Sequence, residues 1–248
     1  MTGDVAVVSG GTRGIGIELS RRLVKLGYQV VAPYRSDDAA ARAAAGELGG
    51  GLAPVRVDLT DPVAVGTAVA GVLDRYPAPR VLVNNAGRNI DRPFLDMTVE
   101  EWRTVVDTNL SSVFYLTRAL APAMLAGGHE DPVIVNIGAS TGIRPRVNGA
   151  NYCASKAGLL QLTKCLALEL APAIRVNCLI PGMTETEELV TRFSLDDPAA
   201  RAKVLAEIPQ RRIGTVENVA DALEFLIGPA SRYMTGQKLV IDGGQFMW

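Results

Sequence analysis

The segment SGGTRGIG, residues 9–16, follows an apolar run directly and precedes a segment of helical period. Its glycines allow a tight turn and a close approach of the backbone to a ligand, and the helix that follows offers free N–H groups to a pyrophosphate. A glycine-rich turn alone is weak evidence, but a strand before it and a helix after it are the context that the dinucleotide-binding motif requires. The loop residues expected to bind the dinucleotide are Gly10, Thr12, Arg13, Gly14, Ile15 and Gly16.

Apolar, β-branched runs alternate with longer segments of helical period along all 248 residues. The runs are nearly continuously apolar, as expected when both faces of a parallel sheet are covered. This alternation predicts one α/β domain over residues 1–248, a Rossmann-type, doubly wound, seven-stranded parallel sheet with helices on both faces. Strands are expected near 4–9, 28–33, 52–57, 80–84, 131–137, 174–180 and 237–241, and helices near 14–26, 37–48, 61–76, 98–126, 150–171 and 216–227.

One segment, residues 183–212, interrupts this alternation between the sixth strand and the last helix. It is polar, has no strand signal and is too long for an ordinary connection. An insertion at the carboxyl end of a strand in an α/β sheet adjoins the ligand-binding edge. We therefore expect a substrate lid here in preference to a linker.

The overall composition excludes several classes of function. The net charge of −1 gives no general attraction to nucleic acid or to an anionic membrane, and no apolar run is long enough to span a bilayer. The N-terminus enters a strand without a basic region, so we expect a cytoplasmic protein without a secretory signal. Cys153, Cys165 and Cys178 have no metal-ligand spacing, and His129 is the only histidine. A histidine-based zinc site and a Ser-His-Asp triad are therefore not expected, and no metal is predicted.

The end of the second strand indicates which dinucleotide is bound. A free ribose 2′-hydroxyl is typically bound by a carboxylate there, whereas this chain has Tyr34, Arg35 and Ser36 ahead of any acid. Arg35 and Arg13 are placed to bind a 2′-phosphate through charge-assisted hydrogen bonds. These residues favour NADP(H) over NAD. The acids at 37–38 leave NAD as the alternative, if a shifted loop brings one of them to the ribose.

Tyr152 and Lys156 are four residues apart in a predicted helix and therefore share a face. A free phenol has a pKa near 10, which is too high for ready proton exchange at neutral pH. A neighbouring ammonium favours the phenolate and is expected to lower that pKa, which would make Tyr152 a usable acid or base. A tyrosine and a lysine on an ordinary helix are the alternative interpretation, so the pair requires other support.

That support comes from a resemblance that extends over nearly the whole chain. The sequence resembles the classical short-chain dehydrogenase/reductase family, and within it the ketoacyl reductases of fatty-acid and polyketide synthesis. Many motifs occur in order and at family spacing, which makes the match highly specific. After the glycine loop, the matching segments are VDLTD, LVNNAG, DTNLSSVF, NYCASKAG, RVNCLIPGMTET and TGQKLVIDGG.

The resemblance implies a role for each matched position. Tyr152 would protonate a ketone oxygen as hydride arrives, Lys156 would lower its pKa and bind the nicotinamide ribose, and Asn109 would kink its helix and hold a relay water. The cofactor contacts implied are Asp58 and Leu59 for adenine, Asn85, Ala86 and Gly87 for the adenine-side ribose, Pro181 and Gly182 for nicotinamide, and Thr184 and Thr186 for its carboxamide.

The sequence departs from the family pattern at one catalytic position. The family has a serine thirteen residues before the tyrosine, and this chain has Ala139 there. Ser140 is the candidate replacement, with Thr141 as the other nearby hydroxyl. Alternatively, the chain is an inactivated serine-to-alanine version, an enzyme that uses other donors, or a protein that binds the cofactor without turnover. Loss of one preorganised donor typically costs about 10²–10³ in rate.

These observations predict an NADPH-dependent ketoreductase, with an NAD(P)-dependent alcohol dehydrogenase and a non-catalytic nucleotide-binding protein as alternatives. The substrate is a small-molecule ketone or an acyl thioester, and Arg144 and Arg146 lie in the loop expected to shape its pocket. Neutral or acidic residues before the fifth strand and after the catalytic helix weaken the case for docking of an acyl carrier. The resemblance implies a homotetramer, and the apolar end at 245–248 is compatible with burial at a subunit contact.

Overall fold

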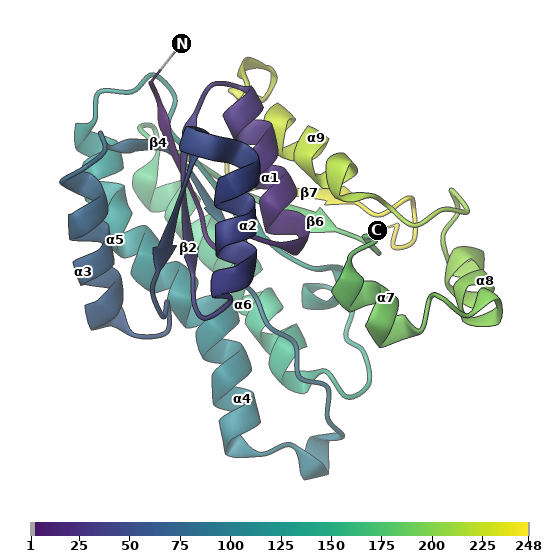
Figure 1. The fold of residues 1–248 in the computed structure, drawn as a ribbon. Coiled ribbons are helices and arrows are strands. Elements are labelled where there is room, and N and C mark those ends of the chain that lie inside the picture. Colours follow the sequence, from purple (N-terminus) through teal and green to yellow (C-terminus); the bar gives the residue numbers. More distant parts are fainter. Residues whose placement is uncertain (1–2, 248) are drawn as a thin grey trace.

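A computed structural model describes residues 3–247, and the predicted seven-stranded sheet is confirmed. All neighbouring strands are parallel, in the order β3-β2-β1-β4-β5-β6-β7 (Figure 1). The strands are β1 (Val5–Val8), β2 (Gln29–Tyr34), β3 (Leu52–Arg56), β4 (Pro79–Asn84), β5 (Val133–Ile137), β6 (Arg175–Pro181) and β7 (Lys238–Ile241). Of the helices described, none has the length and apolar character needed to cross a membrane. Trp248, at the predicted apolar end, lies outside the described residues.

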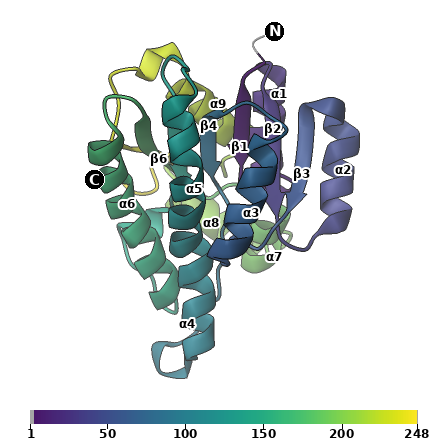
Figure 2. The ribbon, with the colours of Figure 1, turned by 90° about the vertical axis from the view of Figure 1, so that its left-hand side faces the viewer.

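Helices cover both faces of the sheet, as predicted. In β1, Ala6 and Val8 face one core while Val5 and Val7 face the other, which explains the continuously apolar strand. The first core is covered by α1 (Gly14–Lys25), α2 (Asp38–Leu48) and α9 (Val216–Ile227). The second is covered by α3 (Pro62–Leu73), α5 (Ser112–Ala126) and α6 (Ala150–Leu170), and Figure 2 looks onto this face.

The helix predicted over 98–126 is interrupted. It consists of α4 (Val99–Val106), a π-helical turn at Asp107–Ser111 and then α5. The π turn has Asn109 at its centre, and this side chain is buried. A π turn inserts one residue into the helical repeat and is frequent at functional sites. Apolar periodicity does not reveal it, because the pattern continues on either side.

The lid segment, residues 183–212, contains two helices that the sequence analysis did not predict. They are α7 (Glu187–Phe193) and α8 (Pro198–Glu207), and they stand outside the two helical layers (Figure 1). Thr186 caps α7 by accepting from the Leu189 N–H at 3.2 Å, and Asp197 caps α8 by accepting from the Ala199 N–H at 3.0 Å. The caps order a segment whose apolar pattern is too weak to predict a helix.

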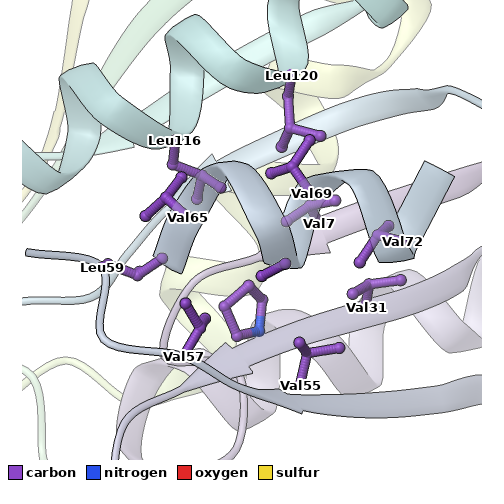
Figure 3. A pocket seen from close by; sticks show the side chains of 12 residues that line it. Val7, Val31, Val55, Val57, Leu59, Val65, Val69, Val72, Leu116 and Leu120 are labelled. Atoms are coloured by element: carbon purple, nitrogen blue, oxygen red, sulfur yellow. The ribbon is translucent and has the colours of Figure 1, made fainter. Parts of the chain in front are cut away.

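A small apolar cavity of about 20 Å³ lies between the sheet and helices α3 and α5. Figure 3 shows that its lining side chains, among them Val7, Val69 and Leu116, point toward one another from these elements. The volume is about that of one water molecule, and the lining has no polar group to bind it. We interpret this cavity as a packing gap of the second core. It is not a ligand site.

Candidate active site

The glycine loop lies at the carboxyl end of β1, where the sheet order reverses between β1 and β4. This switch point is where doubly wound sheets bind ligands. Gly10 has a φ of +65°, which a residue with a side chain rarely adopts, and its N–H donates to the Pro33 carbonyl at 2.8 Å. A Cβ on Gly16 would lie 2.0 Å from the Gly10 oxygen. The loop therefore requires glycine at both positions.

The amino end of α1 is open toward a ligand. Its N-cap residue Arg13 makes no side-chain hydrogen bond to the first N–H groups of the helix. No acidic side chain occupies the first turn. Gly14 begins the helix, Ile15 packs against the first core, and Thr12 is buried behind the loop. The unpaired N–H groups and the helix dipole together suit a pyrophosphate.

Residues after β4 fix this loop from the other side of the switch point. The side-chain amide of Asn85 donates to the Ser9 carbonyl at 3.0 Å and to the Gly10 carbonyl at 3.3 Å. The hydroxyl of Ser9 accepts from the backbone N–H groups of Asn85 and Ala86, at 2.9 and 3.0 Å. The sequence analysis did not select Ser9. Its position directly before the first glycine was the available signal.

The corner after β2 presents the residues predicted to select the dinucleotide. Arg35 and Ser36 are exposed, and the Arg13 guanidinium lies 3.9 Å from the carboxylate of Asp37. Asp37 also caps α2 by accepting from the Ala40 N–H at 3.0 Å. The following acid, Asp38, accepts from the Tyr34 hydroxyl at 3.0 Å and pairs with Arg56, the last residue of β3. Both acids are therefore engaged with protein groups, and the arginines remain on the exposed face.

Asp58 and Leu59 follow β3 beside this corner. Asp58 accepts from the backbone N–H and hydroxyl of Thr60, at 2.9 and 2.7 Å. Partial burial raises the pKa of Asp58, but these two hydrogen bonds and the charge of Arg35 outweigh it, so the pKa lies below its usual value. Arg35 is therefore close to the predicted adenine contacts. Leu59 lines the cavity in Figure 3 and belongs partly to the core.

Tyr152 and Lys156 share one face of α6, and the Lys156 ammonium lies 5.8 Å from the centre of the Tyr152 ring. Lys156 is buried, and its Nζ donates to the Ile137 carbonyl at the end of β5, at 2.8 Å. Burial lowers the pKa of Lys156 to about 8, partly offset by Cys178 nearby. The side chain therefore remains mainly protonated at pH 7, and it is held at the carboxyl edge of the sheet.

The expected lowering of the Tyr152 pKa is wrong for this structure. Burial of the phenol raises its pKa to about 12, and the charges that lower it are those of Arg192 and Arg146. Desolvation disfavours the phenolate more strongly than the cations favour it. Tyr152 therefore holds its proton at neutral pH, which is the form that a proton donor to a ketone needs.

Asn109 connects the π turn to the other site elements. Its Oδ1 accepts from the Arg88 N–H at 2.7 Å, and its Nδ2 donates to the Arg88 carbonyl at 2.9 Å and to the Ser155 hydroxyl at 3.2 Å. A Cβ on Gly87 would lie 3.4 Å from the Asn109 Oδ1 and 3.8 Å from the Lys156 Nζ. Asn109, Gly87 and Lys156 therefore meet at one point. Ser155, which the sequence analysis missed, links Asn109 to α6.

Ala139, at the position of the family serine, lies two residues after β5, and Ser140 begins a 3₁₀ turn over Ser140–Gly142. This turn packs against α6, since a Cβ on Gly142 would lie 2.8 Å from the Lys156 backbone carbonyl. Within residues 3–247, the Thr141 hydroxyl is one of two buried side-chain oxygens that lack a hydrogen-bond partner. An unpaired buried hydroxyl is costly, so the lack of a protein partner for Thr141 requires an explanation.

The segment after β6 forms the remaining side of the site. The Gly182 N–H, directly after Pro181, donates to the Ile241 carbonyl at 3.0 Å. Thr184 is buried and bridges to Gly214, and it lines a polar hollow of about 400 Å³ between the lid and β7. Thr186 serves as the cap of α7. Thr184 therefore lies at the base of the lid and Thr186 at its first helix.

Known proteins resemble this chain over its full length. Residues 10–245 match the family model described as enoyl-(acyl carrier protein) reductase. The chain is 36% identical to the 3-oxoacyl-(acyl-carrier-protein) reductase of Escherichia coli, over 99% of this chain and 98% of that protein. It is also 36% identical to 3β-hydroxysteroid dehydrogenase 1 of Eggerthella lenta, over 100% of this chain and 95% of that protein.

A solved structure of a ketoreductase is also similar to this chain. A variant of the actinorhodin polyketide ketoreductase, crystallised with NADPH, superimposes with a TM-score of 0.91 at 36% identity, covering 98% of this chain and 97% of that one. The fold, the ordered motifs and the full-length matches agree. This chain belongs to the short-chain dehydrogenase/reductase family of oxidoreductases.

Proposed function

We propose that the protein is an NADPH-dependent ketoreductase in which Tyr152 is the general acid. The observation that supports this most strongly is a phenol held protonated by burial, beside a buried ammonium, at the carboxyl edge of the sheet. Bound NADPH would supply the hydride. The relatives named as an oxoacyl reductase and a polyketide ketoreductase support a ketone as the acceptor.

Each residue has a defined part in this reaction. Tyr152 donates its proton to the ketone oxygen as negative charge develops there. Lys156, fixed by the Ile137 carbonyl, binds a ribose hydroxyl and places its charge near the phenolate that remains. Asn109 holds the Arg88 segment and Ser155 against this face of α6, which keeps the two catalytic side chains in register. The open amino end of α1 binds the pyrophosphate.

The direct test is an assay of a ketone panel with NADPH and with NADH, followed by the decrease in reduced-cofactor absorbance. We expect turnover with NADPH, and free ketones and acyl thioesters in the panel distinguish the two substrate classes. Turnover confined to NAD and an alcohol would favour the dehydrogenase alternative. Dinucleotide binding without turnover of any substrate would favour the non-catalytic alternative. The homotetramer, implied by the resemblance, and the cytoplasmic location, expected from the N-terminus, remain predictions.

Arg35 is predicted to select NADPH. Arg35→Gln removes a charge-assisted hydrogen bond to the 2′-phosphate, which is worth about 1.5–3 kcal/mol. We expect the Kd for NADPH to rise by about tenfold or more while the Kd for NADH is unchanged, as measured by titration calorimetry. Arg42→Gln, at an exposed position of α2, is the matched control. Equal weakening of both dinucleotides by Arg35→Gln would contradict the assignment.

Thr141 is proposed to donate to the substrate carbonyl in place of the family serine, whose position Ala139 occupies. Thr141→Val keeps the shape and removes the unpaired buried hydroxyl. We expect kcat to fall by about 10², while the free energy of unfolding rises by about 1 kcal/mol because the desolvation cost is removed. Ser140→Ala, at the position that the sequence analysis preferred, is the comparator. If Ser140→Ala causes the loss and Thr141→Val does not, Ser140 is the donor.

A further inference from the structure

The lid has its own small core and few hydrogen bonds to the body of the protein. Leu195, Ile208 and Ile213 are buried together, in a cluster separate from both sheet cores. At the base, the Gly214 N–H donates to the Met183 carbonyl at 2.9 Å, and the Gly214 carbonyl accepts from the Glu185 N–H at 2.8 Å. The lid also contacts the loop after β7, where the Gln210 N–H donates to the Gly243 carbonyl at 3.1 Å. A segment that packs on itself and joins the body through few contacts can move as a unit.

At the other end of the lid, Asp91 joins two arginines from different elements. Its Oδ1 accepts from Arg146, which lies between β5 and α6, and its Oδ2 accepts from Arg192 of α7. Arg146 also donates to the Asn89 side chain at 2.7 Å. Partial burial raises the pKa of Asp91, but the hydrogen bonds to Arg146 and Asn89 and the charges of both arginines outweigh it. The pKa of Asp91 therefore lies below its usual value. Asp91 therefore stays ionised and can hold both guanidinium groups.

The segment that carries Asp91 is itself fixed to the start of the catalytic helix. The Arg92 N–H donates to the Asn148 carbonyl at 2.8 Å, and the buried Asn151 amide donates to the Ile90 carbonyl at 3.0 Å. The Asn151 side chain also accepts from the backbone N–H of Tyr152 at 2.7 Å. The Asp91 segment is thus attached to the start of α6, next to Tyr152, and the contact of Asp91 with Arg192 links the lid to the same place.

The same arginines are near the phenol. The guanidinium carbon of Arg146 lies 5.7 Å from the centre of the Tyr152 ring. Burial raises the pKa of Tyr152, Arg192 and then Arg146 lower it, and Glu188 and Cys153 raise it. Lys156 faces the ring from α6 at 5.8 Å. Arg192 and Glu188 reach the phenol from the lid, so the lid position determines part of the charge around it.

We propose that Asp91 and Arg192 are positioning residues: together with Arg146 they form a latch that holds the lid over Tyr152 with a second guanidinium group near its phenol. This inference rests on the proposed function, because it assigns the latch to the step in which Tyr152 gives up its proton. When the latch is closed, both arginines stabilise the phenolate that remains. When it opens, the charge of Arg192 is removed along with the lid.

The test compares Arg192→Gln with Arg201→Gln. Arg201 is also a lid arginine, but its partner at 2.8 Å is Glu185, within the lid. We expect Arg192→Gln and Asp91→Asn to increase hydrogen exchange of residues 187–193 by about tenfold and to lower kcat/KM by about tenfold. The rise of alcohol oxidation with pH should move to higher pH in both variants. Arg192→Lys should restore much of the pH profile, and Arg201→Gln should leave all three measurements unchanged.

The outcomes separate the latch from the proposed function. If Arg192→Gln exchanges no faster than Arg201→Gln, the latch is excluded, whether or not the protein reduces ketones. If exchange rises but kcat/KM and the pH profile do not change, the contact is structural and the positioning role is excluded. The double variant Asp91→Asn/Arg192→Gln should have no lower kcat/KM than the more severe single variant, because both substitutions break the same Asp91–Arg192 contact. Full additivity of the two effects would also overturn the proposal.

Discussion

Replacing Tyr152 with phenylalanine is expected to lower kcat for ketone reduction by about 10³, within the range found for a lost general acid. The ring that packs in the site is retained, so the cofactor site and the fold should persist. The NADPH Kd, from cofactor fluorescence, should change by less than about threefold. The loss should appear in kcat, because a loss of uniform binding would raise KM instead. A single-turnover experiment with saturating NADPH locates the loss in the chemical step.

Tyr233→Phe is the matched control, because the Tyr233 side chain is fully exposed and outside the site. It should leave kcat and the NADPH Kd unchanged. A Tyr152→Phe variant with more than about a tenth of the wild-type kcat would contradict the general-acid assignment, since even the weakest general acids contribute about 10². Comparable losses in both variants would indicate an effect on folding.

The pKa of Tyr152 also determines how the rates of ketone reduction and alcohol oxidation depend on pH. A folded-state pKa of about 12 means that the phenol stays protonated at every pH below about 11. Ketone reduction should therefore show no alkaline loss from Tyr152 in the ordinary assay range. Alcohol oxidation needs the phenolate, and its rate should continue to rise with pH through that range. The two directions thus report the same group differently: in this range reduction does not depend on the Tyr152 titration, whereas oxidation rises with pH.

The features that could be predicted from the sequence are those with a local pattern. Continuous apolar runs determine the parallel strands, and the turn around Gly10 and Gly16 requires glycine for steric reasons. The lid helices were missed because each is short and contributes only a few apolar residues to a mostly polar segment. Thr186 and the Asp197–Pro198 pair were available as cap signals, since a capping side chain and a proline in the first turn mark a helix start.

Other features depend on contacts between distant parts of the chain. The i, i+4 spacing correctly placed Tyr152 and Lys156 on one face, but the direction of the Tyr152 pKa shift depends on burial by several elements. Asp91 is one of many loop acids in the sequence, and its role follows only from arginines that approach it from α7 and from the loop before α6. Electrostatic roles of this kind require the tertiary structure.

Lys156→Met is expected to separate stability from activity. Burial lowers the pKa of Lys156 from 10.5 to about 8, so the unfolded chain binds more protons than the folded protein between these values. The charged lysine therefore costs the folded state roughly 3 kcal/mol at pH 7, part of which its bond to the Ile137 carbonyl offsets. We expect the methionine variant to gain about 1 kcal/mol in urea unfolding at pH 7, and to lose that advantage by about pH 10.

The same substitution should lower kcat/KM by about 10², since a buried charge beside the reacting phenol and the ribose is removed. In the wild type, the Kd for NADPH should rise as pH increases through about 8, because Lys156 loses its charge there. The variant should show no such dependence. Lys164→Met, at an exposed position of the same helix, should change none of these quantities. If the methionine variant is less stable than the wild type at pH 7 and binds NADPH with the same pH dependence, then Lys156 is a structural residue, and the proton donor must act without a neighbouring ammonium.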